Sequence, residues 1–284
     1  MARGEFRPPR EHLPGADVGG TATDPLRVVV GSDRLDCPWR SLVILRYNGG
    51  GGDADFQADD SKYKLISASE AHGFIAVFPN GYSRLPSGIL ATWNAGNCCG
   101  GAQKNNVDDA GFIRAMIDRI EGQARIDPKR IFATGTSNGG MMSWRLACKV
   151  PEIHAIAPVE GTDMSPNCRP SRPVPVIEFH AADDPNVPFN GGVGVGPSHA
   201  FMTSVPATQA KWVAINGADP HSRRVLTVPG AHCDLHSGPA PVELCVTDTG
   251  GHSWPGGGTQ QGRKQPSMAI SANELMWEFF TSLK

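Results

Sequence analysis

Short apolar and β-branched runs alternate along the chain with longer stretches in which apolar residues recur at helical spacing. This alternation is typical of a mostly parallel, twisted sheet covered by helices on both faces, so the predicted fold class is α/β. The apolar runs predict strands at residues 26–30, 42–47, 74–78, 130–134, 153–159, 174–179, 223–227 and 242–248.

The clearest helical pattern lies at residues 107–124. Ile113, Met116 and Ile120 recur there at a spacing that places them on one face of a helix. Asp109 lies in the first turn, where a carboxylate interacts favourably with the helix dipole. Similar patterns predict helices at residues 56–71, 138–149, 206–216 and 266–283.

At 284 residues the chain is long enough to bury a large core, and α/β proteins of this size commonly form one domain. We therefore expect a single domain at residues 26–284. Residues 1–25 are rich in Pro, Gly and charge and lack the apolar segment of a secretory signal, so they predict a flexible N-terminal arm.

The composition narrows the classes of partner. The formal net charge is -2 and no block of like charge occurs, whereas nucleic acid and anionic membranes are bound by clustered basic side chains. The longest apolar runs are strand-length, far below the roughly 20 residues that span a bilayer. We expect neither nucleic acid nor a membrane as a partner, and the sequence leaves the oligomeric state open, a homodimer included.

The chain contains seven cysteines, more than a cytosolic enzyme usually carries and too few for a small disulfide-built fold. One or more disulfides are expected, with at least one thiol left over. Such pairs would indicate an oxidising compartment, in which case a secretory signal has been removed.

Four loops rich in Gly and Pro follow predicted strands, at residues 48–53, 79–106, 184–204 and 249–266. In an open α/β sheet, ligands bind in the crevice beyond the carboxyl ends of the strands. Residues that carry chemistry are therefore expected in these loops.

The sequence Gly135-Thr136-Ser137-Asn138-Gly139 places G-x-S-x-G between a predicted strand and a predicted helix. A sharp turn at this point strains the serine backbone and presents Ser137 Oγ above the sheet, while Gly135 and Gly139 approach each other without side chains. The backbone N–H of Asn138 then lies at a helix N-terminus, where it stabilises a developing oxyanion. The alternative is that Ser137 merely caps the helix.

Two later loops supply an acid and a base in the chain order serine, acid, histidine. Asp183 and Asp184 follow the strand at 174–179, and either can accept a hydrogen bond from an imidazole; alternatively, the Asp-Pro pair only begins a turn. His252 follows the strand at 242–248, and no helical or strand pattern explains it. Its imidazole would take the serine proton and return it to the leaving group, with the carboxylate fixing its tautomer.

A second oxyanion donor is expected from the glycine run that follows the strand at residues 42–47. Gly50 and Gly49 are the candidates, because bare backbone N–H groups suit this task. A phosphate-binding loop is disfavoured because no Gly-Lys-Ser/Thr follows, and a merely flexible loop is the remaining alternative.

His232 and His236 lie four residues apart and raise the question of a metal site. Zinc needs a third and usually a fourth ligand, and flanking Gly and Pro argue against a helix that presents both rings on one face. We expect no metal and no cofactor. A disulfide between Cys233 and Cys245 across a hairpin is the other interpretation of this segment.

Seven sequence blocks occur in order and carry a family resemblance. They are GGGG at 49–52, FPNGY at 78–82, WNAGNCCG at 93–100, VDDAGFIRAMID at 107–118, TGTSNGGMMSWRLAC at 134–148, DPNVP at 184–188 and GGHSWPGG at 250–257. Together they resemble the extracellular polyhydroxybutyrate depolymerase and feruloyl-esterase-like enzymes of the α/β-hydrolase superfamily, over most of residues 40–282.

The resemblance implies an α/β-hydrolase fold and a serine hydrolase that cleaves carboxylic esters through an acyl-enzyme. It implies Ser137, Asp184 and His252 as the catalytic triad, and the DPNVP block selects Asp184 over Asp183. The implied location is extracellular or periplasmic.

By the same resemblance, Trp93 and Trp254 flank the acyl pocket, with a role in the core as the alternative for such large aromatic side chains. Cys98 and Cys99 resemble part of the family's structural cysteine set, with no pairing assigned.

The chain departs from the family pattern at two places, before the predicted oxyanion loop and in the turn that carries the predicted acid. Asn48 stands where the family usually has a histidine before the glycine run. The acid turn carries two adjacent carboxyl groups, Asp183 and Asp184, and such a pair can raise the pKa of one member.

The expected substrate is an ester: a polyhydroxyalkanoate-type polyester, a feruloyl or acetyl ester, or a small acyl ester. The alternative is an amide-bond hydrolase that acts with the same triad on a poly-amino-acid such as poly(aspartic acid). A non-catalytic binding protein is disfavoured because Ser137, Asp184 and His252 are all present.

Overall fold

The structure is a computed structural model that describes residues 26–30, 43–48, 59–85, 88, 90–122, 126–259 and 264–283. The predicted N-terminal arm at residues 1–25 lies outside the described residues. All eight predicted strands have a counterpart in the described part, most of them shifted by one or two residues.

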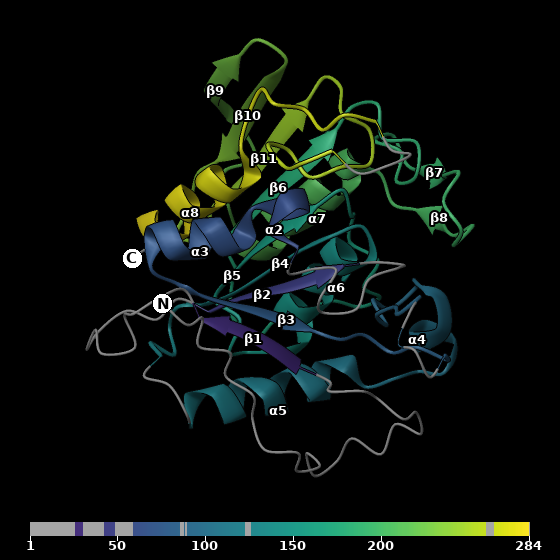
Figure 1. Cartoon of the computed structure of the whole chain (residues 1–284). Helices are drawn as coiled ribbons and strands as arrows, with labels where there is room; N and C mark the ends of the chain where they lie inside the picture. Colours follow the sequence, from purple (N-terminus) through teal and green to yellow (C-terminus); the bar gives the residue numbers. More distant parts are fainter. Residues whose placement is uncertain are drawn as a thin grey trace.

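A mixed sheet forms the centre of the fold (Figure 1). Its strand order is β1-β3-β2-β4-β5-β6-β11-β10-β9, and every pairing from β3 to β11 is parallel, while β1, β10 and β9 pair antiparallel at the two edges. The bounds are β1 Leu26–Val30, β2 Val43–Asn48, β3 Ile75–Pro79, β4 Ile131–Thr136, β5 Ala155–Val159, β6 Val176–Ala181, β9 Arg223–Val228, β10 Ala231–His236 and β11 Val242–Thr247. The predicted mostly parallel sheet is confirmed.

The central strands bury both of their faces, because successive side chains point to opposite sides of a strand. In β3, Ile75 and Val77 join one hydrophobic core, whereas Ala76 and Phe78 join the other. In β4, Ala133 and Phe132 divide in the same way. This double burial explains why the central strands appear in the sequence as continuous apolar runs.

Helices cover each face of the sheet. Helices α5 (Asp109–Glu121), α6 (Asn138–Lys149) and α7 (Val205–Asn216) contribute to the first core. Helices α2 (Asp60–Tyr63), α3 (Leu65–His72) and α8 (Ala272–Ser282) contribute to the second, and α3 and α8 lie together on the side of the sheet away from α5 (Figure 1). No helix in the described ranges combines the length and the apolar character needed to cross a bilayer.

Some observed elements differ from the predicted ones. The helix predicted at 56–71 is divided into α2 and α3 by Lys64, which adopts the left-handed conformation at φ 54°. The predicted loop at 79–106 contains the short helix α4, Gly100–Lys104. The loop after the acid contains a hairpin of β7 (Gly192–Val193) and β8 (Phe201–Met202), and β10 was not predicted as a separate strand.

The described residues include three disulfides: Cys98–Cys99, Cys148–Cys168 and Cys233–Cys245. The last confirms the pairing considered for the 233–245 segment, and it joins two residues that face each other across the β10–β11 hairpin. The prediction of one or more disulfides is therefore confirmed.

A buried carboxyl group ties the start of α5 to the loop that precedes it. Asp109 Oδ2 accepts a hydrogen bond from the backbone N–H of Asn94 at 2.7 Å, and the residue is only 4% exposed. Burial raises the pKa of Asp109 to about 7, although the Asn94 N–H and the charge of Arg145 oppose that shift. Between about pH 4 and pH 7 the folded protein therefore keeps a proton on Asp109, whereas the unfolded chain, in which Asp109 has its ordinary pKa of 3.8, has released it.

Asp109→Asn is expected to flatten the dependence of stability on pH. In the wild type, the contribution of Asp109 to the free energy of unfolding falls as pH rises from about 4 to about 7, by up to about 1.4 kcal/mol per pH unit. The amide keeps an oxygen that accepts from Asn94 N–H but does not ionise. Denaturant unfolding at pH 4 and pH 8 measures the free energy of unfolding of both proteins. The value for the variant relative to the wild type should be higher at pH 8 than at pH 4; a difference between the two proteins that is independent of pH contradicts this account.

Candidate active site

Four neighbouring parallel strands, in the order β4-β5-β6-β11, end at the same edge of the sheet. Ser137 directly follows β4, Asp184 lies three residues after β6, and His252 lies five residues after β11. Glu160 directly follows β5, the strand between the first two. These polar side chains therefore start from adjacent strand ends although more than 100 residues separate the first from the last.

Backbone hydrogen bonds continue from strand to strand just beyond this edge. The N–H of Ser137 donates to Val159 O at 2.9 Å, and the N–H of Glu160 donates to Phe179 O at 2.9 Å. The N–H of Ala182 donates to Thr247 O at 2.8 Å. The starting points of the four loops are thus fixed relative to one another.

Ser137 lies in a strained turn between β4 and α6. Its φ of 60° and ψ of -126° form a combination that costs a residue with a side chain roughly 1–3 kcal/mol. The hydroxyl makes no capping hydrogen bond to α6, so the interpretation of Ser137 as a simple helix cap does not fit. The backbone is that of a sharp strand-to-helix turn that exposes a serine hydroxyl.

At two positions beside this turn only glycine fits, because backbone atoms of other segments lie where a Cβ atom would be. A Cβ at Gly140 would lie 2.8 Å from Val159 O, and a Cβ at Gly161 would fall against Ser137 O and lie 2.8 Å from Met141 N. The sequence motif pointed to Gly135 and Gly139 but not to Gly161, which follows a different strand. A Glu-Gly pair after a buried strand was the only signal available in the sequence.

Asn138 begins α6, so its backbone N–H has no partner within the helix. Its buried side chain forms a reciprocal amide pair with Trp93: Oδ1 accepts from Trp93 N–H at 2.7 Å, and Nδ2 donates to Trp93 O at 3.0 Å. This pair ties the loop around residue 93 to the N-terminus of the helix that follows Ser137.

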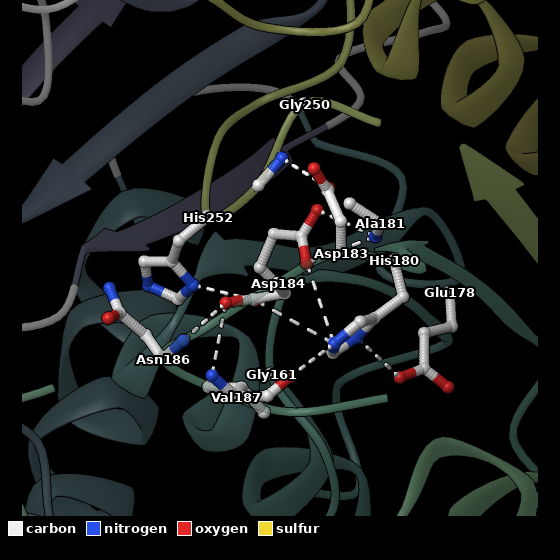
Figure 2. A network of polar contacts seen from close by, with 12 residues as sticks. Gly161, Glu178, His180, Ala181, Asp183, Asp184, Asn186, Val187, Gly250 and His252 are labelled. Carbon is white, nitrogen blue, oxygen red and sulfur yellow. Dashed lines mark hydrogen bonds and ion pairs between the residues drawn. The ribbon is translucent and has the colours of Figure 1, made fainter. Parts of the chain in front are cut away.

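Asp184 and His252 are in direct contact (Figure 2). His252 Nδ1 lies 2.7 Å from Asp184 Oδ2, while Asp184 Oδ1 accepts from the N–H groups of Asn186 at 2.7 Å and Val187 at 3.1 Å. Burial opposes ionisation of Asp184, but the hydrogen bond and the charge of His252 outweigh burial and lower the pKa of Asp184 to about 2. Asp184 is therefore a fixed anion beside the ring.

Asp183 faces a different part of the same loop. Its Oδ1 accepts from the backbone N–H of Gly251 at 2.7 Å, and its Oδ2 lies 3.0 Å from Lys264 Nζ. Of the two adjacent carboxyl groups, only Asp184 contacts the imidazole of His252 among the described contacts. Asp183 instead holds the backbone one residue before His252.

The structure does not bring all predicted site residues into contact. Within the described part of the chain, Ser137 Oγ makes no hydrogen bond to His252. Gly49 and Gly50, the predicted second oxyanion donors, lie outside the described residues. The pair of Asp184 and His252 is formed, and Ser137 lies at the same sheet edge, at the end of β4, which β5 separates from β6.

The two tryptophans predicted to flank the acyl pocket are fully buried. Trp93 is 0% exposed and stacks on Phe112, and Trp254 is 1% exposed with its Nε1 donating to Asn273 Oδ1 at 3.1 Å. Trp254 also meets Tyr63 edge to face. These are the surroundings of core residues, and contact with a substrate stays a prediction.

Three buried titratable groups near Asp184 were not anticipated from the sequence. Glu160, Glu178 and His180 are each no more than 1% exposed and lie in or just after the central strands. Charged residues within apolar strand segments were the available signal, since such residues are almost never buried unless paired.

Two groups of side chains bear on the question of a metal. Glu160, Asp184 and His252 place one ligand atom each within 4.8 Å of one another, but Asp184 and His252 already satisfy each other. His232 and His236 lie four residues apart on the extended strand β10, about 13 Å from end to end, so a single ion cannot contact both rings.

Comparison with known proteins identifies relatives among esterases. The chain is 32% identical over 205 residues to feruloyl esterase B of Piromyces equi, an alignment that covers 68% of this chain but only 36% of that protein. It is 30% identical over 281 residues to a protein described as the esterase NocK of Nocardia uniformis subsp. tsuyamanensis, covering 88% and 78% of the two chains. Comparison with protein-family models finds no match.

Among solved structures, the fold resembles the acetyl xylan esterase from Aspergillus awamori with a TM-score of 0.60 and 15% identity, over 90% of this chain and 93% of that one. The parallel sheet, the helices on both faces and the serine turn after β4 define an α/β-hydrolase fold. The chain belongs to the feruloyl-esterase-like family of α/β-hydrolase esterases.

Gly161→Ala is expected to disturb the serine turn from a distance in sequence. The added Cβ falls against Ser137 O, which belongs to rigid backbone, so the variant should lose about 1–3 kcal/mol of stability and most of its activity. Gly122→Ala is the matched control, because its Cβ meets nothing closer than 3.5 Å and its φ is -71°. Thermal unfolding and ester hydrolysis measure both; wild-type behaviour of Gly161→Ala would contradict the close approach.

Proposed function

We propose that this protein is a serine hydrolase that cleaves carboxylic esters through an acyl-enzyme, with Ser137, Asp184 and His252 as the catalytic triad. The observation that carries the proposal is the 2.7 Å contact between His252 Nδ1 and Asp184, at the same sheet edge as a serine held at φ 60° after β4. The names of the relatives, which are esterases, support the same reaction class.

The proposed reaction follows from the roles of these groups. His252 Nε2 takes the proton of Ser137 as Oγ attacks the ester carbonyl, and it gives that proton to the leaving alcohol when the tetrahedral intermediate collapses to the acyl-enzyme. Water then enters by the same route and releases the acid. Asp184, ionised and bonded to Nδ1, keeps Nε2 free for this proton transfer and stabilises the imidazolium.

The oxyanion would be stabilised by the backbone N–H of Asn138, at the N-terminus of α6, and by an N–H of Gly50 or Gly49. The distance between Ser137 and His252 is expected to shorten when substrate binds. Catalytic hydrogen bonds are often long without substrate and tighten only in the complex.

The substrate class that we propose is an ester of a hydroxycinnamic or acetic acid with a sugar, because relatives are named feruloyl esterase and acetylxylan esterase. A polyhydroxyalkanoate-type polyester and the amide bond of a poly-amino-acid are alternatives that no specific observation favours. The alignment covers little more than a third of feruloyl esterase B, so the substrate of that protein carries over only as a proposal.

We also propose that residues 26–284 form one catalytic domain that works outside the cytoplasm. The described residues contain three disulfides, which persist in oxidising compartments. An extracellular or periplasmic location agrees with a polymeric sugar ester as substrate.

Ser137→Ala is expected to lower kcat by on the order of 10⁶ while leaving the fold intact, because it removes the nucleophile. The measurement is release of product from p-nitrophenyl acetate, methyl ferulate, a polyhydroxybutyrate film and poly(aspartic acid), with wild type and variant side by side. Hydrolysis of the amide polymer alone by the wild type would overturn the ester proposal. Wild-type rates from Ser137→Ala would overturn its role as nucleophile.

The two carboxyl groups of the acid turn are expected to respond differently. Asp184→Asn should lower kcat by on the order of 10⁴, because the amide no longer fixes the tautomer of His252. Asp183→Asn should change kcat by less than about tenfold, since its remaining oxygen still accepts from Gly251 N–H. Steady-state kinetics on one ester decides the order; a larger loss from Asp183→Asn would exchange the assigned roles.

A further inference from the structure

Glu160 occupies the end of the strand that lies between those carrying Ser137 and Asp184. It follows β5 directly, is 1% exposed and adopts φ 48°, a conformation that strains a residue with a side chain. Strain of this kind persists only where the surrounding structure holds the residue in place. The reaction described above gives Glu160 no role.

The carboxyl group of Glu160 is directed at the acid of the triad. Its oxygens lie 3.0 and 3.2 Å from the backbone N–H nitrogen of Ala181, and one of them is 3.5 Å from His180 Nε2. One carboxyl oxygen of Glu160, one of Asp184 and a ring nitrogen of His252 all lie within 4.8 Å of one another.

Two carboxyl groups this close at a buried site share one proton, because two negative charges at this distance repel strongly. Asp184 accepts from the N–H groups of Asn186 and Val187 and from His252, whereas Glu160 accepts from Ala181 alone among the described backbone donors. The negative charge is therefore favoured on Asp184 and the proton on Glu160. Burial, with the charge and hydrogen bond of Asp184, raises the pKa of Glu160 well above its ordinary value.

Two further titratable groups, Glu178 and His180, lie near Asp184 (Figure 2). They leave this assignment unchanged. His180 Nε2 donates to Val187 O at 2.8 Å, whereas Glu160 Oε2 lies 3.5 Å and Asp184 Oδ2 lies 3.7 Å from the same nitrogen, so the carbonyl is its hydrogen-bond partner. Its Nδ1 lies 3.6 Å from Glu178, whose carboxylate raises the pKa of the imidazole against the effect of burial. Burial also raises the pKa of Glu178, which His180 and Gln209 oppose. Both pKa values are thus shifted toward keeping one proton on the Glu178–His180 pair, which is neutral as a whole, and one negative charge remains for Glu160 and Asp184 to share.

We infer that Glu160 is a positioning residue of the triad: as a neutral carboxylic acid it donates a hydrogen bond to the Asp184 carboxylate and holds that carboxylate against His252. The inference rests on the proposed function. A donor behind Asp184 restricts rotation of the carboxylate, which keeps His252 Nδ1 bonded while the ring becomes an imidazolium. Its loss should affect kcat and leave KM unchanged, because Glu160 lies behind Asp184 and does not touch the substrate.

The test compares Glu160→Gln, which keeps a donor and an acceptor, with Glu160→Met, which keeps the volume but removes both. Glu160→Gln should retain kcat within about threefold, because its NH₂ donates to Asp184 while its oxygen accepts from Ala181 N–H. Glu160→Met should lower kcat about 10- to 100-fold with KM within about twofold, the loss typical when an outer partner of a functional side chain is removed.

Glu243→Gln and Glu243→Met are the matched controls. Burial raises the pKa of Glu243 to about 7, and the charges that affect it belong to Arg223 and Glu278, away from the triad. Both control variants should retain wild-type kcat. Equal kcat for Glu160→Met and the wild type overturns the inference. So does a loss of kcat in Glu160→Gln as large as that in Glu160→Met. The inference also fails if Glu243→Met, at a similar fall in melting temperature, loses as much kcat as Glu160→Met.

A second measurement needs no destabilising variant. In protein labelled with ¹³C at glutamate carboxyl carbons, the signal absent from Glu160→Gln belongs to Glu160, and at pH 7 it should have the chemical shift of a protonated acid. The shift of an ionised carboxylate overturns the inference. Absence of any ester turnover by the wild type would instead overturn the proposed function, since the protonation state of Glu160 is measured without substrate.

Discussion

In a parallel sheet, backbone hydrogen bonding makes neighbouring strands run in one direction, so all of them end at one edge. This constraint assembles the candidate site, because β4, β5, β6 and β11 are consecutive in the sheet although they are dispersed along the chain. The hydrogen bonds from Ser137, Glu160 and Ala182 to the next strand extend the alignment one step beyond the strands. Each loop therefore starts from a fixed point, and short loops are enough to bring polar side chains together.

The same packing buries several titratable side chains behind the site. Three carboxyl groups and one imidazole are removed from water within the central strand ends. Burying a single ionised group without a partner costs far more free energy than one hydrogen bond returns. The arrangement is tolerable because each group has an assigned partner: Glu178 with His180, and Glu160 with Asp184, which in turn faces His252.

The parts of this fold that could be predicted from the sequence are those with a strong local cause. Strands buried on both faces appear as apolar runs, and α5 shows its buried face as a helical repeat. The division of the 56–71 helix at Lys64 depends on one residue in the left-handed conformation, which no spacing of apolar residues reveals.

For the site, the G-x-S-x-G motif and the chain order were enough to propose Ser137 and His252, because each follows a predicted strand. They left Asp183 and Asp184 open as the acid, and only the family resemblance selected Asp184. Glu160 and Gly161 were missed because their importance comes from contacts with other strands. A glutamate and a glycine after an apolar run look ordinary until the neighbouring strand ends are known. Long-range packing of this kind leaves no periodic signal in one sequence.

The amide pair between Asn138 and Trp93 has a consequence for how such a protein can diversify. Two hydrogen bonds make the backbone at residue 93 move as one body with the start of α6. The stretch before it, from Gly81 to Thr92, joins the sheet to this anchor and is closed on itself by the bridge between Tyr82 and Thr92. Insertions between those two bridge residues would therefore change the surface of the protein while the turn at Ser137 keeps its geometry. Related proteins can vary in length here without disturbing the serine.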